Sequence, residues 1–177
     1  EIMQVESALS KDLDEPGYLK MIGDKTSSLI SASTLIGAIT ATKDQERRDS
    51  LFRYGEKLGT MFQIKDDLLD ITGLEREIGK PTMFDLKKNM LTLPLIYILS
   101  KQEKSSRKQF MSDLKYLSKK NKKKEIKSMI IDMGGVEYAE KKIEQLSEDH
   151  RRTAYMPQQP RTTPGPTNHP RPARRGR

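Results

Sequence analysis

The chain has 177 residues, with 33 Lys or Arg against 25 Asp or Glu, which gives a formal charge of +8. It has no Cys, which excludes a disulfide scaffold, a thiolate metal site and a cysteine nucleophile, and its 2 His leave no catalytic triad to propose. The longest near-apolar run, residues 91–99, is under half of the roughly 20 residues that a membrane-spanning helix needs. We therefore expect a cytoplasmic protein of one domain, without a transmembrane segment.

Residues 1–150 have apolar side chains at helical spacing and no alternating strand pattern of useful length. Residues 1–13 have the pattern of the end of a helix, which indicates that the chain is a fragment. Pro16 suits the first turn of the next helix, where its missing N–H costs little. That helix is predicted to run to about Thr42, and its second half is rich in small residues that allow a neighbour to approach closely.

A long helix is predicted next. Asp44 can cap its beginning, it runs to about Ile71, and Gly73 is a suitable C-terminal cap. A loop from Gly73 to about Asp85 follows. Shorter helices are then predicted over residues 92–99, 107–118, 124–133 and 137–148.

Residues 151–177 differ sharply in composition from the preceding body. They hold seven Arg, six of the nine Pro and neither Lys nor acidic residues, so that the tail carries +7 and residues 1–150 only +1. Such a segment cannot bury enough apolar surface to offset its ordering entropy, and we expect disorder. A basic tail could bind nucleic acid or an anionic membrane, but Tyr155 is its one aromatic residue, so we expect no nucleic-acid partner. The abrupt change also favours a chimeric or out-of-frame end.

The segment of residues 62–70, FQIKDDLLD, indicates the chemistry. On a helix, Asp66 and Asp70 lie one turn apart and face the same way, with Gln63 one turn earlier. Burying these carboxylates among apolar neighbours without compensation would cost roughly several kcal/mol. We therefore expect a cation between them. Together with Asp67 they form a hard-oxygen site, which suits Mg²⁺ rather than zinc. Because Mg²⁺ usually combines one or two carboxylates with phosphate oxygens, we expect a phosphorylated substrate.

Three further polar residues fit this interpretation. Lys25 and Thr26 lie in a helix whose other residues are small, and Lys80 follows the acidic helix in a loop. Lysines beside an acidic metal site are understandable if a polyanion bridges them. The alternative is that both the acidic string and the lysines belong to solvated surfaces, as such residues usually do.

Several blocks in order resemble the trans-type polyprenyl diphosphate synthases. They are Glu1-Ile2-Met3-Gln4, the segment from Tyr18 to Ala32 with Lys25-Thr26, the acidic string of residues 62–70, Gly79-Lys80-Pro81, Asp85-Leu86 and the run from Leu91 to Tyr97. The resemblance covers about residues 1–150. It implies an all-α bundle around a central cavity, in which an allylic diphosphate ionises with the help of Mg²⁺ and is attacked by isopentenyl diphosphate.

The resemblance also implies roles for single residues. The expected Mg²⁺ ligands and catalytic acidic residues are Asp66, Asp67 and Asp70. Lys25, which we also expect to be catalytic, and Lys80 would contact the diphosphate, Thr26 and Gln63 would line the site, and Lys65 would contribute from its edge.

The family has a further aspartate-rich motif upstream of the first block, and this chain starts after that point. We therefore expect the C-terminal half of a prenyltransferase, inactive alone and with an exposed apolar face, from a parent that is a homodimer. A non-catalytic helical interaction module and a terpene cyclase remain as alternatives. Product length and the preferred allylic primer are not determined by these residues.

Overall fold

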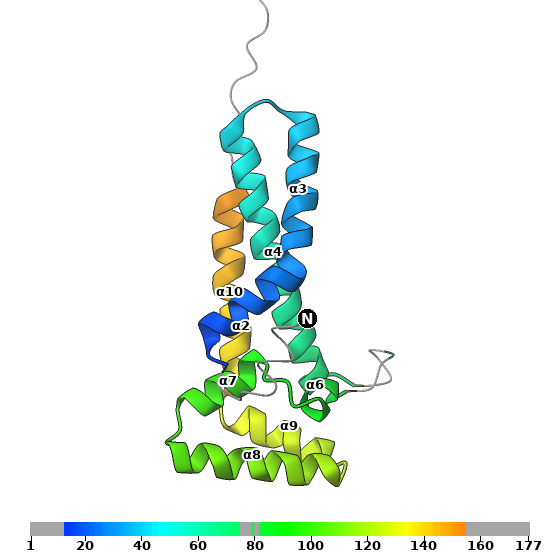
Figure 1. Cartoon of the computed structure of the whole chain (residues 1–177), viewed down its shortest axis with the longest axis vertical. Coiled ribbons are helices and arrows are strands. Elements are labelled where there is room, and N and C mark those ends of the chain that lie inside the picture. The colour runs from blue at the N-terminus through cyan, green and yellow to red at the C-terminus, as the bar shows by residue number, and fades with distance from the viewer. Residues whose placement is uncertain (1–12, 75–78, 80–81, 155–177) are drawn as a thin grey trace, which may run out of the picture.

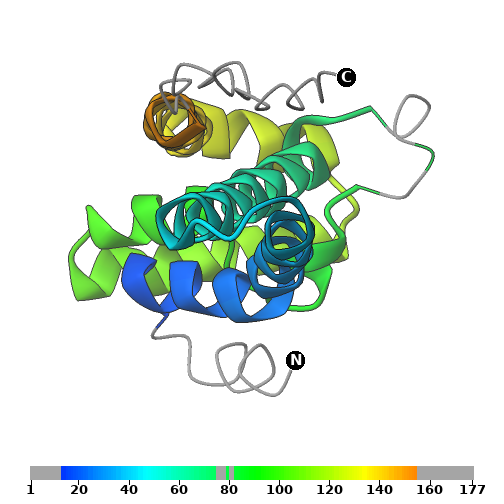
Figure 2. The ribbon, with the colours of Figure 1, turned by 90° about the horizontal axis from the view of Figure 1, so that it is seen from above.

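The computed structural model describes residues 13–74, 79 and 82–154. Within these residues all regular elements are helices, as predicted for an all-α fold. Helices α3, α4 and α10 run side by side, with α4 between the other two, and α8 and α9 lie across one end (Figures 1 and 2). In chain order the elements are α2 (Glu15–Ile22), η1 (Gly23–Ser27), α3 (Ser28–Ala41), α4 (Gln45–Thr72), α6 (Phe84–Lys87), α7 (Leu93–Ser100), α8 (Lys104–Lys119), α9 (Lys123–Asp132) and α10 (Gly135–Ala154).

The helix predicted from Pro16 to Thr42 is present but is not uniform. Asp14 caps its beginning, since its carboxylate accepts a hydrogen bond of 2.9 Å from the amide of Gly17. Between α2 and α3 the five residues Gly23–Ser27 form the π-helical element η1. Such wide turns are uncommon and occur frequently at functional sites, and this one contains Lys25 and Thr26.

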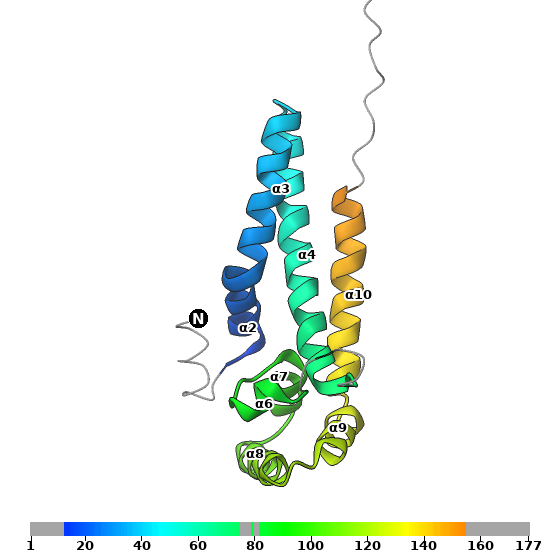
Figure 3. The same ribbon diagram turned by 90° about the vertical axis from the view of Figure 1, so that its right-hand side faces the viewer.

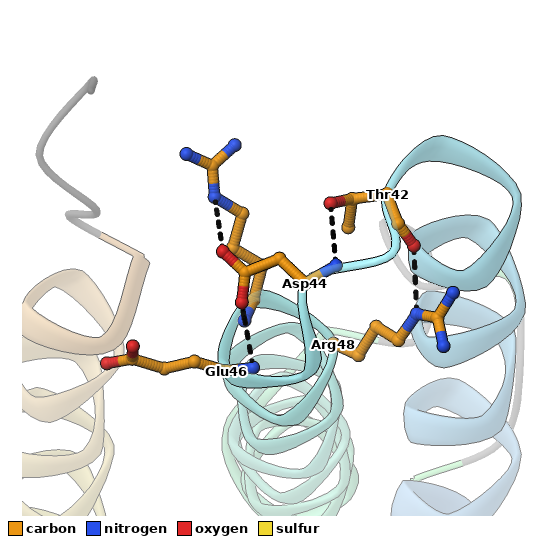
Figure 4. A network of polar contacts seen from close by, with 5 residues as sticks. Thr42, Asp44, Glu46 and Arg48 are labelled. Carbon is orange, nitrogen blue, oxygen red and sulfur yellow. Dashed lines mark hydrogen bonds and ion pairs between the residues drawn. The ribbon is translucent and has the colours of Figure 1, made fainter. Parts of the chain in front are cut away.

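The turn between α3 and α4 is fixed by the cap that the sequence predicted (Figure 4). The Asp44 carboxylate accepts from the amides of Glu46 at 3.0 Å and Arg47 at 3.4 Å, which satisfies donors that have no partner within the helix. Arg48 Nε donates to the carbonyl of Thr42 at 2.9 Å, and this bond joins the end of one helix to the beginning of the next. These bonds therefore fix the orientation of α3 relative to α4 at the turn.

Helix α3 packs on α4 through small residues and turns large ones outward. A Cβ on Gly55 would lie 2.6 Å from the Cα of Ser31 in α3, and a Cβ on Gly59 would lie 2.5 Å from the Cα of Ser27 at the end of η1, so that only glycine allows these approaches. Ser31 is buried against α4, whereas Leu29 is 72% exposed and Ile36 is 64% exposed. The predicted small residues are thus explained by close packing, and the exposed apolar face that we expected lies on the opposite side of α3.

The core continues into the end of the molecule where α7, α8 and α9 lie (Figure 3). The apolar run of residues 91–99 supplies most of helix α7, which is largely buried. Leu91 and Thr92, the two residues of the run that precede the helix, are buried as well. Core side chains of this region include Ile64 and Leu68 of α4, Leu93, Ile96 and Ile98 of α7, Leu114 of α8, and Ile126 and Ile130 of α9. The predicted helices over 107–118 and 124–133 are found as α8 and α9, whereas the short helix α6 lies where a loop was predicted to end.

Helix α10 extends to Ala154, so that it includes the first four residues of the expected tail, 151–154. Arg and Ala favour helix, and the first Pro of this region is residue 157, which explains the extension. The rest of the predicted tail lies outside the described residues, as do residues 1–12. Among the helices that are described, none has the length and apolar character needed to cross a membrane.

Candidate functional site

A chain of hydrogen bonds connects three of the predicted site residues. Thr26 Oγ1 donates to Gln63 Oε1 at 2.9 Å, and Gln63 Nε2 donates to Asp67 Oδ1 at 2.8 Å. The other oxygen of Asp67 accepts from the hydroxyl of Tyr18 at 2.7 Å. The chain joins η1, α4 and α2, so that the tertiary packing of these elements fixes the orientation of all four side chains.

Asp67 is the electrostatic centre of this group. It is only 6% exposed, and burial raises the pKa of its carboxyl to about 6, because desolvation disfavours the charged form. The bonds from Tyr18 and Gln63 act in the opposite direction, while the negative charges of Asp85 and Asp66 raise the pKa further. Burial, followed by the charge of Asp67, also raises the pKa of the Tyr18 hydroxyl. The two hydrogen bonds to Asp67 therefore do not outweigh its burial and the neighbouring negative charges.

Asp70 has a different set of partners. Its side chain is 6% exposed and accepts hydrogen bonds from two backbone amides, that of Phe84 at 3.0 Å and that of Asp85 at 3.2 Å. Its own carbonyl accepts from the amide of Met83 at 2.8 Å. Asp70 thus holds the beginning of α6 against the end of α4, and it brings Asp85 towards the acidic group.

The sequence argument expected a cation to compensate the buried carboxylates. At Asp67 and Asp70 neutral donors supply part of that compensation, namely a phenol and a side-chain amide in the first case and two backbone amides in the second. Asp66 is half-buried on the same helix, and its charge acts on Asp67. The three acidic residues therefore have distinct surroundings, although they lie within five positions of α4.

Two of the predicted lysines are exposed neighbours of this region along the chain. Lys25 is exposed on η1, next to Thr26, and Lys65 is exposed on α4, next to Asp66. Lys80 lies outside the described residues. The structure thus brings together Thr26, Gln63 and Asp67. Along the chain, Lys25 is next to Thr26 and Lys65 is next to Asp66.

The side chains offered by this region are suitable for a hard divalent cation. Residues 13–74, 79 and 82–154 contain no group of three or more His, Cys, Asp or Glu side chains that could hold a metal. Mg²⁺ does not require such a group, because it commonly binds one or two carboxylates and completes its octahedron with water and phosphate oxygens. Asp66 provides a carboxylate at the half-buried edge, and the unfavourable interaction among the charges of Asp66, Asp67 and Asp85 is one that a cation would relieve.

Sequence reasoning did not place Tyr18 and Asp85 in the site. Tyr18 donates to Asp67, and the charge of Asp85 acts on both Asp67 and Tyr18. Both residues occur in the blocks that carry the family resemblance, at the start of the segment with Lys25-Thr26 and in Asp85-Leu86. Their positions in those blocks were the only indication in the sequence that they belong to the site. Neither the residue type of Tyr18 nor that of Asp85 indicates a site by itself.

Comparison with known proteins gives consistent matches. The family model described as "Polyprenyl synthetase" matches residues 1–133. The chain is 38% identical over 124 residues to the short chain isoprenyl diphosphate synthase of Methanocaldococcus jannaschii, which covers 69% of this chain and 37% of that protein. It is 35% identical over 128 residues to the geranylgeranyl diphosphate synthase of Saccharolobus solfataricus, which covers 72% of this chain and 39% of that protein.

A similar solved structure is that of the heptaprenyl diphosphate synthase of Staphylococcus aureus. The TM-score is 0.74 and the identity 28%, and the match covers 86% of this chain and 47% of that one. The chain therefore spans less than half the length of these relatives.

Proposed function

The chain belongs to the polyprenyl synthetase family. We propose that the complete protein, at the length of its relatives, elongates an allylic diphosphate with isopentenyl diphosphate. In this reaction the bond between the allylic carbon and the diphosphate oxygen breaks, and the diphosphate leaves with the electron pair. The double bond of isopentenyl diphosphate then forms the new carbon–carbon bond, and loss of a proton completes the extension by five carbons.

The observation that carries the proposal is the charge concentrated at Asp66, Asp67 and Asp85 and held in place from three helical elements. We assign Asp66 as the side chain that holds Mg²⁺, since it is half-buried on the acidic helix. When bound, Mg²⁺ would neutralise the charge of the leaving diphosphate. Asp67 and Asp70, whose carboxylates accept bonds from protein donors, act as positioning residues in this proposal.

The remaining predicted residues are assigned roles according to the charge and hydrogen-bonding capacity of their side chains. Lys25 and Lys80 would supply positive charge to the diphosphate, and Lys65 would add to it from the edge of the site. Thr26 and Gln63 orient Asp67 through the bonds described above and would line the site on the side of the allylic cation.

The apolar part of the substrate also has a suitable surface. Phe62 precedes Asp66 by one turn of α4 and is 62% exposed, and Leu58, one turn earlier again, is 39% exposed. A hydrocarbon chain attached to a diphosphate near Asp66 could cover both side chains. From the family resemblance we further propose that the complete protein is a homodimer of the cytoplasm.

The binding half of the proposal is tested with the chain itself. Inorganic diphosphate is titrated by calorimetry in the presence of Mg²⁺, and binding is expected to require the metal. Asp66→Asn should weaken binding by about tenfold or more, since a charge-assisted contact is lost. Asp49→Asn, the same change at an exposed position of the same helix, is the matched control and should leave binding unchanged. Equal binding by both variants would contradict the assignment of Asp66.

The catalytic half is tested in a chimera. The segment of the S. solfataricus synthase that matches this chain is replaced by the corresponding residues of the chain, and incorporation of labelled isopentenyl diphosphate is measured. Asp66→Asn in the chimera should lower kcat by about a hundredfold or more. A folded chimera that elongates equally well with and without Asp66 would refute the proposed mechanism.

A further inference from the structure

A second concave region lies apart from the acidic group, between the beginning of α2, helix α7 and helix α8. It is a hollow of about 740 Å³, within the range of small-molecule sites of roughly 300 to 1,000 Å³. Its lining contains none of the candidate site residues that the structure describes. Nothing in the proposed prenyl chemistry uses it.

One wall of this hollow is strongly basic. Lys104, Arg107, Lys108 and Lys115 follow one another at helical spacing along one face of α8, and all four line the hollow. Within the described part of the chain, no acidic side chain forms an ion pair with Lys104, Lys108 or Lys115. Positive charge is therefore concentrated along this wall.

Two acidic residues, Asp14 and Glu15, also line the hollow, against four basic ones. Asp14 accepts from the amide of Gly17 at 2.9 Å, and Glu15 accepts from Lys142 at 2.6 Å and from the hydroxyl of Tyr138. Their carboxylates are engaged in the cap of α2 and in the contact with α10. The hollow as a whole thus favours an anion.

The floor of the hollow is apolar. It is formed by Leu13, Ile96, Leu99 and Met111, together with the ring of Tyr97. That ring is stacked on Tyr138, with the centroids 4.1 Å apart and the planes at 10°, so the floor is rigid on this side. An apolar floor below a basic wall suits a molecule with both characters.

A second hollow, of about 330 Å³, lies further along α8. Met111 and Lys115 line both hollows, and we call the two together the α8 groove. The lining of the second hollow is mixed: the apolar side chains of Leu86, Met90, Leu91 and Leu114 lie beside polar ones that include Lys87 and Lys119. The 16 residues of α8 correspond to about 24 Å, which is long enough for an extended chain of a dozen or more carbons.

We propose that the α8 groove binds a single-chain amphiphile with an anionic head group. The head lies at Lys104, Arg107 and Lys108, where three cationic side chains occur within five positions, and the chain extends past Met111 into the second hollow. Phosphate, diphosphate and carboxylate heads share the required charge. The site is separate from the proposed prenyl site and needs no metal.

The probe for this proposal is dodecyl phosphate below its micelle concentration, titrated into the chain by calorimetry with EDTA present. Lys104→Ala with Lys108→Ala should weaken binding about tenfold, since two charged contacts to the head are lost. The control, Lys120→Ala with Lys124→Ala, removes two exposed lysines that do not line the groove and should leave the affinity unchanged. Equal loss in both double variants would reveal non-specific attraction to a basic protein and would overturn the proposal.

Two further measurements test the apolar part and the location. Met111→Gln should weaken the binding of dodecyl phosphate severalfold, and inorganic phosphate, which has no chain, should bind at least about tenfold more weakly than dodecyl phosphate. Asp66→Asn should have no effect, which separates this site from the proposed diphosphate site and makes the two failures distinguishable. If Asp66→Asn abolished binding, or if the chain bound anionic vesicles but not the monomeric probe, the groove would not be the site.

Titration with farnesyl diphosphate and with dodecanoate then distinguishes an isoprenoid from a fatty-acid source. The affinity of both ligands is compared between the unaltered chain and the double variant Lys104→Ala with Lys108→Ala. The ligand whose affinity falls further identifies the natural source as isoprenoid or fatty acid. Failure of both to bind, with dodecyl phosphate binding retained, would restrict the class to phosphate monoesters of straight chains.

Discussion

Tyr18 donates a hydrogen bond of 2.7 Å to the carboxylate of Asp67, although the two residues are 49 positions apart in the chain. Both side chains are buried, and the bond joins α2 to the acidic stretch of α4. Because Asp67 also accepts from Gln63, its carboxylate is oriented from two sides. The position of the acidic group therefore depends on the packing of α2 as much as on the sequence of α4.

Tyr18→Phe should destabilise the chain by about 1 to 3 kcal/mol, because a buried carboxylate loses a donor while the ring remains in place. The free energy of unfolding is measured with urea. Tyr116→Phe, at a position that is 61% exposed, is the matched control and should leave it unchanged. A Tyr18→Phe variant as stable as the control would show that the bond contributes nothing to the fold.

Asp70→Ala should release the beginning of α6, since its carboxylate holds the amides of Phe84 and Asp85. We expect faster hydrogen exchange at these two amides and a loss of about 1 to 3 kcal/mol in stability, both independent of Mg²⁺. The control is Asp113→Ala, which removes an exposed carboxylate bonded to Gln109 on α8. Effects that appear only with Mg²⁺ present would instead indicate that Asp70 acts as a metal ligand.

Gly59→Ala should destabilise the contact of η1 with α4 by about 1 to 3 kcal/mol, because the added Cβ would lie 2.5 Å from the Cα of Ser27. Gly37→Ala offers the opposite case, since a Cβ there meets nothing within 4 Å and the residue is inside α3. It should stabilise the chain by up to about 1 kcal/mol through helix propensity. Thermal unfolding of the two variants checks the pair, and equal shifts of Tm would disprove the close approach.

Glu15 gives a dependence of stability on pH. Burial raises the pKa of its carboxyl, but the bond from Lys142, with that from Tyr138, outweighs burial, so that the pKa lies below the ordinary value of 4.5. A carboxyl whose pKa is lowered by folding contributes stability above its unfolded pKa, and that contribution is lost as the pH falls through the folded value.

Glu15→Gln should therefore cost about 1 kcal/mol at pH 7, and the difference from the unaltered chain should shrink as the pH falls below about 4. Urea unfolding at pH 7, 5 and 3 measures it. Glu137→Gln is the control, because Glu137 pairs with Lys141 on an exposed face of α10 and its loss should not be measurable. A difference between Glu15→Gln and the unaltered chain that stayed constant with pH would rule out ionisation of Glu15 as its cause.

Local patterns were sufficient for most of the secondary structure. The cap at Asp44 and the end of α4 near Gly73 were predicted because capping depends on residues within one turn of each other. The extent of α10 was underestimated, since charge and Pro content were used to place its end, and a helix tolerates several residues of a basic tail before the first Pro. The π-helical element at Lys25 was not predicted, because apolar periodicity does not distinguish a single wide turn from a regular helix.

The acidic site shows the limit of this approach. The sequence by itself determined that α4 carries Asp66, Asp67 and Asp70 within five positions, and the spacing of acidic residues on a helix is a local property. Only the tertiary structure decided that Asp67 is bonded by Tyr18 and that Asp70 holds the backbone before Asp85, because those partners come from distant segments. Burial and the partners of a carboxylate determine whether it is compensated by a neutral donor or by a cation, and both arise when helices pack.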